Sequence, residues 1–236
     1  MTPTTRIRSR ATKPNRRDPE QTRADIIRAA TEEFAARGLR GARVDAVAKR
    51  TRTTRAMIYY YFKSKEGLYL AVLEGAYRRI REAEKELDLA HLQPVEAMRR
   101  LVAFTFDYYQ AHPSFVALVV AENQSGGKFM RKVDSMRRVN ASIIDSLSAV
   151  LHLGAIDGVF RRGIDAVDVH MMIVALGLFQ IANRHTFGYL FGRNMTAQPY
   201  VDSARTLVTE IVLRYLTPET IAGAKQSADA AVTGDG

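Results

Sequence analysis

Apolar residues recur at helical spacing along most of this chain, and no run alternates between apolar and polar positions as a half-buried strand would. The pattern is interrupted at glycine, proline and capping residues, where helices commonly begin or end. We therefore expect an all-α fold. Helices are predicted around residues 22–37, 44–48, 55–62, 64–87, 94–112, 113–123, 129–153, 166–189 and 199–216.

Two short helices separated by a polar break lie between Val44 and Lys65. The break, residues 51–54, contains no apolar side chain, and the hydroxyl of Thr54 suits the N-cap of the second helix. The inward side of the second helix consists of Ile58, Tyr61 and Phe62, and its outward side presents Arg55, Ala56, Tyr59 and Tyr60. This arrangement predicts a helix-turn-helix whose second helix can enter the major groove of DNA.

Residues 26–71 resemble the N-terminal DNA-binding domain of TetR-family transcriptional repressors. The resemblance is carried by Ala29–Ala30, Phe34, Gly38, Val47–Ala48, Ile58–Tyr59, Phe62, Ser64–Lys65–Glu66, Leu68 and Leu73. The segment Asn183–Arg184–His185–Thr186, followed by Phe191–Gly192–Arg193, resembles a C-terminal subfamily of such regulators. The resemblance implies a three-helix DNA-binding head on a larger helical body, which binds a small molecule and dimerises through its last two long helices.

Two positions depart from the family pattern. Ala42 and Arg43 supply no capping hydroxyl before the first short helix, and a missing cap costs roughly 1 kcal/mol. The turn between the two short helices reads Thr51–Arg52 where a glycine is usual, and a non-glycine residue at positive φ is strained. Either the turn differs slightly from the family pattern or the strain is absorbed.

We divide the chain into four parts. Residues 1–21 form a flexible basic arm, which either contacts DNA or remains a solvated tail. Residues 22–65 form the DNA-binding head, whose first helix is expected to be capped by Thr22. Residues 66–217 form the body, which carries ligand binding and dimerisation, and residues 218–236 form a disordered tail.

The charge is distributed unevenly between these parts. Residues 1–65 contain 17 Lys and Arg against 6 Asp and Glu, whereas residues 66–236 contain 18 against 19. A basic head on a nearly neutral body is typical of a protein that binds a polyanion such as DNA, because charge that serves only solubility would be spread evenly. Within the body, an acidic and exposed end of helix 64–87 is expected from Glu82, Glu84, Glu86 and Asp88.

Other chemistry has little support. The chain has no cysteine, and none of its five histidines lies three or four residues from another, so we expect no disulfide and no metal site. It contains no nucleophile elbow and no phosphate loop, so we expect neither an enzyme nor a cofactor. A cytoplasmic protein without a membrane span is expected, because no signal peptide is visible and the longest uncharged apolar stretch, 169–183, has only 15 residues.

The resemblance and the position on the second short helix together assign the contacts with double-stranded DNA. Arg55, Ala56 and Tyr60 are predicted to face base edges, and Arg55 can pair with both acceptors of a guanine. Thr54, Tyr59 and Lys65 are predicted to contact phosphates. The alternative for the two tyrosines is packing in the core of the head.

The resemblance places a small-molecule pocket in the body, between residues 64 and 187. Many aromatic residues and methionines there suggest an apolar or aromatic effector. The candidate lining residues are Phe104, Tyr108, Phe115, Val119, Met136, Asn140, Ile143, Met172, Phe179 and Asn183. Glu122 and His185 could orient the effector. The alternative for each of these residues is a place in the ordinary hydrophobic core.

These features together predict a ligand-responsive repressor that binds a pseudo-palindromic operator as a homodimer. A dimer is expected because one head reads only a few base pairs, and because the middle of helix 166–189 is apolar on all sides. The alternatives are an architectural DNA-binding protein without an effector and, less well supported, a basic helical enzyme.

Overall fold

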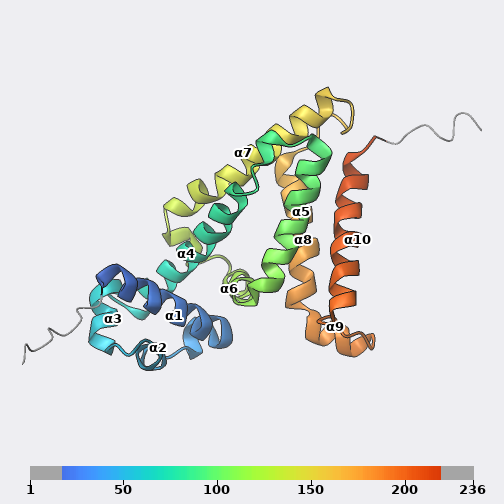
Figure 1. Ribbon diagram of the computed structural model, residues 1–236. Coiled ribbons are helices and arrows are strands. Elements are labelled where there is room, and N and C mark those ends of the chain that lie inside the picture. The colour runs from blue at the N-terminus through green and yellow to red at the C-terminus, as the bar shows by residue number, and fades with distance from the viewer. Residues whose placement is uncertain (1–17, 219–236) are drawn as a thin grey trace, which may run out of the picture.

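The computed structural model describes residues 18–218, and every regular element in that range is a helix (Figure 1). Three helices form an N-terminal head, and the remaining helices form a longer body. The predicted all-α fold is confirmed for this part of the chain. Residues 1–17 of the predicted arm and residues 219–236 of the predicted tail lie outside the described residues.

The head consists of α1 (Pro19–Gly41), α2 (Val44–Thr51) and α3 (Arg55–Phe62). Its core is built from the inward faces of all three helices, and its buried members include Ile26, Phe34, Val47, Ile58 and Phe62. Because these side chains occupy one face of each helix, the opposite face of α3 is left toward solvent.

The first helix begins one turn earlier than predicted. Asp18, not Thr22, is the N-cap, and its carboxylate accepts the backbone N–H of Glu20 at 3.0 Å. Pro19 follows at the first helical position, where its fixed φ favours a helix start, and Thr22 instead donates its hydroxyl to the carbonyl of Asp18. The predicted stop at Gly38 is present as a kink, with φ at 61°, after which one further turn runs to Gly41.

Of the two alternatives for the turn of the helix-turn-helix, the structure shows the strained one. Arg52 ends α2 in the left-handed conformation, with φ at 51°. A residue with a Cβ pays a steric cost of about 1–2 kcal/mol in this region, which glycine avoids.

The body is formed by seven α-helices within the described residues, most of which run side by side in Figure 1. They are α4 (Lys65–Lys85), α5 (Pro94–Ala111), α6 (Pro113–Gln124), α7 (Ser135–Ile156), α8 (Ala166–Ala182), α9 (Arg184–Leu190) and α10 (Gln198–Leu216). Two short 3₁₀ helices, η1 (Leu89–His91) and η2 (Met130–Lys132), complete the described elements. α4 starts in the head, where Ser64 caps it by accepting the N–H of Gly67 at 2.9 Å, and runs into the body beside α7.

The single helix predicted over residues 129–153 is wrong at its start. The chain forms η2, then an extended residue at Val133, and α7 begins only at Ser135. Glu122 explains the early turn, because its buried carboxylate accepts the backbone N–H groups of Phe129 and Met130 at 2.7 and 2.8 Å. These N–H groups are thereby satisfied without a continuous helix.

The predicted helix over residues 166–189 is also two helices. It bends by 70° at Asn183, where α8 ends and α9 begins. The N–H of Phe187 donates to the carbonyl of Asn183, so the second helix starts in a new direction directly at the bend.

The acidic end predicted for α4 is only partly exposed. Glu82, Glu86 and Asp88 face solvent, but Glu84 is 6% exposed and lies against the body. The prediction for Glu84 is therefore wrong, because helical periodicity places it on the face that carries Arg81 and Ile80, which are buried as well.

One helix, α7, is long and apolar enough to cross a membrane by length and composition alone. Its apolar side instead packs into the body, where Ile143, Leu147 and Leu151 are buried, and α7 contacts α4, α5 and α8. This packing is typical of a core helix in a helical bundle.

We expect the substitution Arg52→Gly to raise the free energy of unfolding by about 0.5–1 kcal/mol, because glycine removes the left-handed strain and retains part of that gain after its larger unfolded-state entropy. Urea denaturation followed by circular dichroism measures the change. Lys49→Gly is the matched control, since Lys49 is an exposed residue inside α2, and we expect it to lower the stability by about 1 kcal/mol. Two changes of the same sign would contradict the strain at Arg52.

Candidate DNA interface and effector sites

The outward face of α3 carries the residues predicted to contact DNA. Thr54 caps the helix, and its hydroxyl accepts the N–H of Met57 at 3.1 Å. Arg55, Ala56 and Tyr60 are exposed, and Tyr60 is 71% exposed, so it does not pack in the core of the head. The three predicted base-contacting residues thus lie on one accessible face.

Arg55 is held in place by its neighbours. Its Nε and Nη2 donate to the hydroxyl of Tyr59 at 3.3 and 3.2 Å, and its guanidinium lies 5.3 Å from the centre of the Tyr59 ring. Asp45 of α2 lies 3.9 Å from Nη1. Because these contacts already order a long side chain, less side-chain entropy would be lost on binding a partner at this position.

Lys65 lies at the start of α4, where its Nζ donates to the carbonyl of Arg40 at 3.1 Å. This bond joins α4 to the last turn of α1. An ammonium group has three donors, so one contact within the protein leaves capacity for a phosphate.

Glu33 positions α2, and the sequence patterns did not identify it. Its carboxylate is 2% exposed and accepts the N–H of Arg43 at 3.1 Å; Arg43 is the N-cap residue of α2, and its own side chain makes no capping bond. It also pairs with Arg37 at 3.2 Å and Arg50 at 3.6 Å. Helical periodicity could have identified Glu33, because it follows Ile26 by seven residues and therefore lies on the same buried face of α1.

Two family models match the chain. The model described as bacterial regulatory proteins, tetR family, matches residues 26–72, and the model described as tetracyclin repressor-like, C-terminal domain, matches residues 94–212. The chain belongs to the TetR family. The first match covers the helix-turn-helix, and the second covers α5 to α10 almost completely.

Individual proteins agree with this assignment. The transcriptional repressor NicS of Pseudomonas putida strain KT2440 is 32% identical over 210 residues, which cover 89% of this chain and 99% of NicS. The solved structure of the transcriptional regulator SCO4942 from Streptomyces coelicolor is 26% identical with a TM-score of 0.62, over 84% of this chain and 99% of SCO4942. The structure of the transcriptional regulator FadR from Bacillus subtilis in complex with stearoyl-CoA shares the fold, with a TM-score of 0.64 and 18% identity over 82% of this chain and 98% of FadR. These similar proteins are regulators of transcription.

The residues proposed from the sequence as an effector pocket are spread through the body of this TetR-family protein. Tyr108, Phe115 and Met136 are buried in the part of the core next to the head, with Phe104 and Val119 packed against them. Ile143 and Met172 belong to the second part of the core, and Phe179 is 42% exposed. Asn140 donates to the carbonyl of Met136, and Asn183 lies at the bend between α8 and α9.

The two polar residues proposed to orient an effector also have other surroundings. Glu122 is engaged within the protein, because one carboxylate oxygen accepts two backbone N–H groups and the other accepts the Tyr69 hydroxyl at 3.3 Å. His185 is exposed, and Arg184 lies within hydrogen-bond distance of its Nε2. No group of three or more potential metal ligands occurs within residues 18–218.

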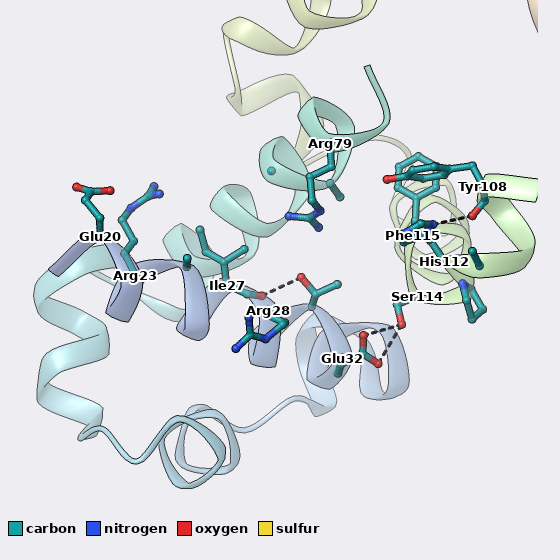
Figure 2. Close-up of a pocket in the computed structure, with 16 residues that line it drawn as sticks. Glu20, Arg23, Ile27, Arg28, Glu32, Arg79, Tyr108, His112, Ser114 and Phe115 are labelled. Atoms are coloured by element: carbon teal, nitrogen blue, oxygen red, sulfur yellow. Dashed lines mark hydrogen bonds between the residues drawn. The ribbon is translucent and has the colours of Figure 1, made fainter. Parts of the chain in front are cut away.

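A cavity of about 710 Å³ lies at the junction of head and body (Figure 2). One wall is α1, with Ile27 and Arg28, and the opposite wall is formed by α4 and the corner between α5 and α6, with Arg79, Tyr108 and Phe115. Of the predicted pocket residues, Tyr108 and Phe115 line this cavity. Any rotation of the head about its junction with the body changes the width of this space.

The junction cavity is bridged at one edge. The hydroxyl of Ser114, at the start of α6, donates to the carboxylate of Glu32 on α1 at 3.0 Å (Figure 2). Both groups are accessible to solvent, so this bond adds little stability, but it marks where α1 and α6 approach each other.

We expect Glu33→Ala to lower the free energy of unfolding by about 2 kcal/mol, because it leaves the N–H of Arg43 without its acceptor and removes two ion pairs. Thermal and urea denaturation measure the loss. Glu32→Ala is the control, since Glu32 is the neighbouring exposed carboxylate, and it should change stability by less than about 0.5 kcal/mol. Equal effects from both variants would show that Glu33 has no special role in positioning α2.

Proposed function

We propose that this protein is a homodimeric, ligand-responsive repressor in the cytoplasm that binds a pseudo-palindromic operator through α3. The observation that carries the proposal is the face of α3, where an ordered arginine and an exposed tyrosine project from a capped helix in the most basic part of the chain. The similarity to NicS, a transcriptional repressor, over nearly its whole length supports the same direction of regulation.

The DNA contacts divide into two classes. Arg55, Ala56 and Tyr60 lie toward the exposed side of α3 and are proposed to read base edges in the major groove. Thr54, Tyr59 and Lys65 are proposed to contact phosphates, which fix the register of α3 without reading sequence. Tyr59 also orients Arg55, because its hydroxyl accepts from the guanidinium of Arg55 while its ring remains half-buried.

The dimer is proposed to form through α8 and α10, which pack against each other. Large apolar side chains recur at intervals of four or eight residues on the outer side of each helix and remain exposed. On α8 they are Val167, Met171 and Phe179, and on α10 they are Leu207, Ile211 and Tyr215. A two-fold axis through this surface would bury these side chains in a four-helix interface and would place the two heads on successive turns of one face of the DNA, roughly 34–36 Å apart.

The effector response is proposed to act through the junction of head and body. An effector that binds the body and favours one position of α4 changes the spacing of the two heads, and the junction cavity provides room for that movement. To convert a population from 99:1 to its inverse, the effector must prefer the released state by about 5.5 kcal/mol. The structural neighbour FadR, solved with stearoyl-CoA, supports a body of this fold as a place for a small molecule.

The base contacts are tested with an operator selected from genomic DNA fragments by the purified protein. We expect Arg55→Ala to cost about 1–3 kcal/mol of discrimination at one base position, because one side chain reads one or two adjacent base edges. Fluorescence anisotropy with single-base operator variants measures the discrimination. The assignment of Arg55 fails if the variant retains the full preference at every position.

Lys65→Ala provides the matched phosphate variant. We expect it to weaken binding to all sequences by a similar factor and to reduce the slope of log affinity against log salt by about one, because one phosphate contact is lost. A loss confined to one base position would instead make Lys65 a base-reading residue.

We expect Met171→Glu to convert the dimer to a folded monomer, because it places a charge at the centre of the apolar surface of α8, where Met171 is 63% exposed. Sedimentation velocity at about 10 μM measures the mass, and operator affinity should fall on the order of 100-fold because the second head loses its effective concentration. Ile156→Glu, at a 64% exposed position of α7, is the control and should remain dimeric. A monomeric wild-type protein would contradict the proposed interface directly.

A further inference from the structure

The last turns of α4 contain a buried ion pair with poor hydrogen-bond geometry. Arg81 and Glu84 are each 6% exposed, and Nη1 of Arg81 lies 3.0 Å from Oε2 of Glu84. Nevertheless, Nε and Nη1 of Arg81 and both carboxylate oxygens of Glu84 have no hydrogen-bond partner within residues 18–218. Two charged groups have thus lost water without gaining the bonds that normally replace it.

Other ion pairs in this protein are better hydrogen-bonded than the Arg81–Glu84 pair. On the same helix, the exposed Arg78 donates from Nε and Nη2 to Glu74 at 3.2 and 2.7 Å. In the head, the buried Glu33 is satisfied by a backbone N–H and two arginines. A buried ion pair is often less stabilising than apolar residues of the same size. Folding stability therefore does not explain why Arg81 and Glu84 are buried here.

A cavity reaches this pair from the side of η1 and α7. It has a volume of about 390 Å³, and Arg81 and Glu84 are among its lining residues. Two exposed residues of opposite charge, Lys85 and Asp88, also line it. The rest of the wall is mostly apolar and comes from the segment after α4 and from α7: Leu89, Leu92, Pro94, Ile143, Val150 and Leu153. The two hydroxyls of Ser142 and Ser146 also line it. Ile143 was one of the residues predicted to line a pocket.

The groups around Arg81 leave its positive charge incompletely balanced. Burial raises the pKa of Glu84 to about 7, although the neighbouring Arg81 opposes this shift. On the side of α8, burial and then Arg81 lower the pKa of His170 to about 4, and on α5 burial raises the pKa of Tyr109. At neutral pH His170 and Tyr109 are therefore uncharged, and Glu84 carries a proton in part of the molecules, so an additional anion beside Arg81 would be favoured.

We propose that the Arg81–Glu84 pair binds the carboxylate of a small effector whose apolar body occupies the cavity between α4, η1 and α7. Arg81 donates its unpartnered N–H groups to the effector carboxylate. Glu84 takes up a proton from solvent and donates it in a hydrogen bond to the same carboxylate. The apolar wall selects an aromatic or branched body, and the cavity volume suits a small molecule. This inference rests on the proposed function, because it names the class of effector that releases the operator.

The position of the site links it to the head. α4 is one continuous helix from its cap at Ser64 in the head to Lys85, so a shift at its C-terminal end moves its N-terminal end as well. An effector that enters between α4 and α7 changes the packing of these two helices against each other. The head then moves with α4, and the width of the junction cavity changes.

The test uses the full-length protein with benzoate as the probe and benzamide as its uncharged isostere. We expect benzoate, at roughly ten times its Kd, to raise Tm by about 4 °C and to weaken operator affinity about tenfold, and benzamide to do neither. The panel also includes acetate and 3-methylbutanoate, of which only the branched acid should act. The absence of a Tm shift with every carboxylate, or an equal shift with benzamide, would overturn the proposal.

The double variant Arg81→Met/Glu84→Met locates the site. Replacing both members of the pair by apolar residues should leave Tm equal or higher and operator binding unchanged, while the response to benzoate disappears. The control Glu96→Met/Arg100→Met removes an exposed pair on α5 and should retain the response. A benzoate response that persists in the Arg81→Met/Glu84→Met protein would place the effector elsewhere and overturn the proposal.

A second variant guards against a folding defect in the double variant. Glu84→Gln keeps the size and mimics the protonated acid, so it should retain benzoate binding and make the affinity independent of pH between about 6 and 8. Loss of binding in Glu84→Gln would exclude the protonated Glu84 as donor and overturn the proposal. The Tm measurement needs no DNA. A benzoate-induced Tm shift in a protein that binds no operator would therefore support the binding site and contradict only the proposed repressor function.

Discussion

Tyr69 joins the head to the body, and the orientation of the DNA-reading helix depends on that connection. Its ring packs edge-to-face against Phe34 of α1, with centroids 5.1 Å apart, and against Phe129 before η2, at 5.4 Å. Its hydroxyl donates to the carboxylate of Glu122, which in turn accepts the backbone of Phe129 and Met130. The apolar core is therefore continuous from the head through α4 into the part of the body around α6. A head connected in this way cannot rotate freely and must move with the helices that it touches.

Buried carboxylates have two contrasting roles in this structure. Glu33 and Glu122 each satisfy backbone N–H groups that the local helix pattern leaves unpaired, and each thereby determines where a neighbouring helix begins. Glu84 does not satisfy any backbone group within residues 18–218 and faces one arginine at an unfavourable angle. Since unsatisfied buried charge is costly, the first two positions are explained by folding and the third is better explained by binding.

The sequence predicted those features that depend on neighbours along the chain. Helical periodicity and capping residues located most helices, including the cap at Thr54. The sequence left open whether the turn at Arg52 would be left-handed. The features that it did not predict depend on groups distant in the sequence. The break before α7 requires Glu122, and the start of α2 requires Glu33, which lies ten residues earlier on another helix. The exposed face of α3 could be assigned because a short amphipathic helix has only one side that can pack.

The cavity beside Arg81 and Glu84, which we propose as the effector site, shows most clearly why such a site cannot be recognised from the sequence. Arg81 and Glu84 are three residues apart on a helix, which is the usual spacing of a solvated surface pair, and the acidic residues around them suggest an exposed end. Their burial is decided by α7 and by the segment around η1, which cover this face only after the chain has folded. An apolar wall and one buried charge pair together define an amphipathic ligand, whereas the composition of the body alone indicated only its apolar part. Arg81 and Tyr69 are separated by roughly 18 Å along a single helix. Because this helix is stiff, a movement that a ligand causes near Arg81 is passed on to Tyr69 and to the connection with the head.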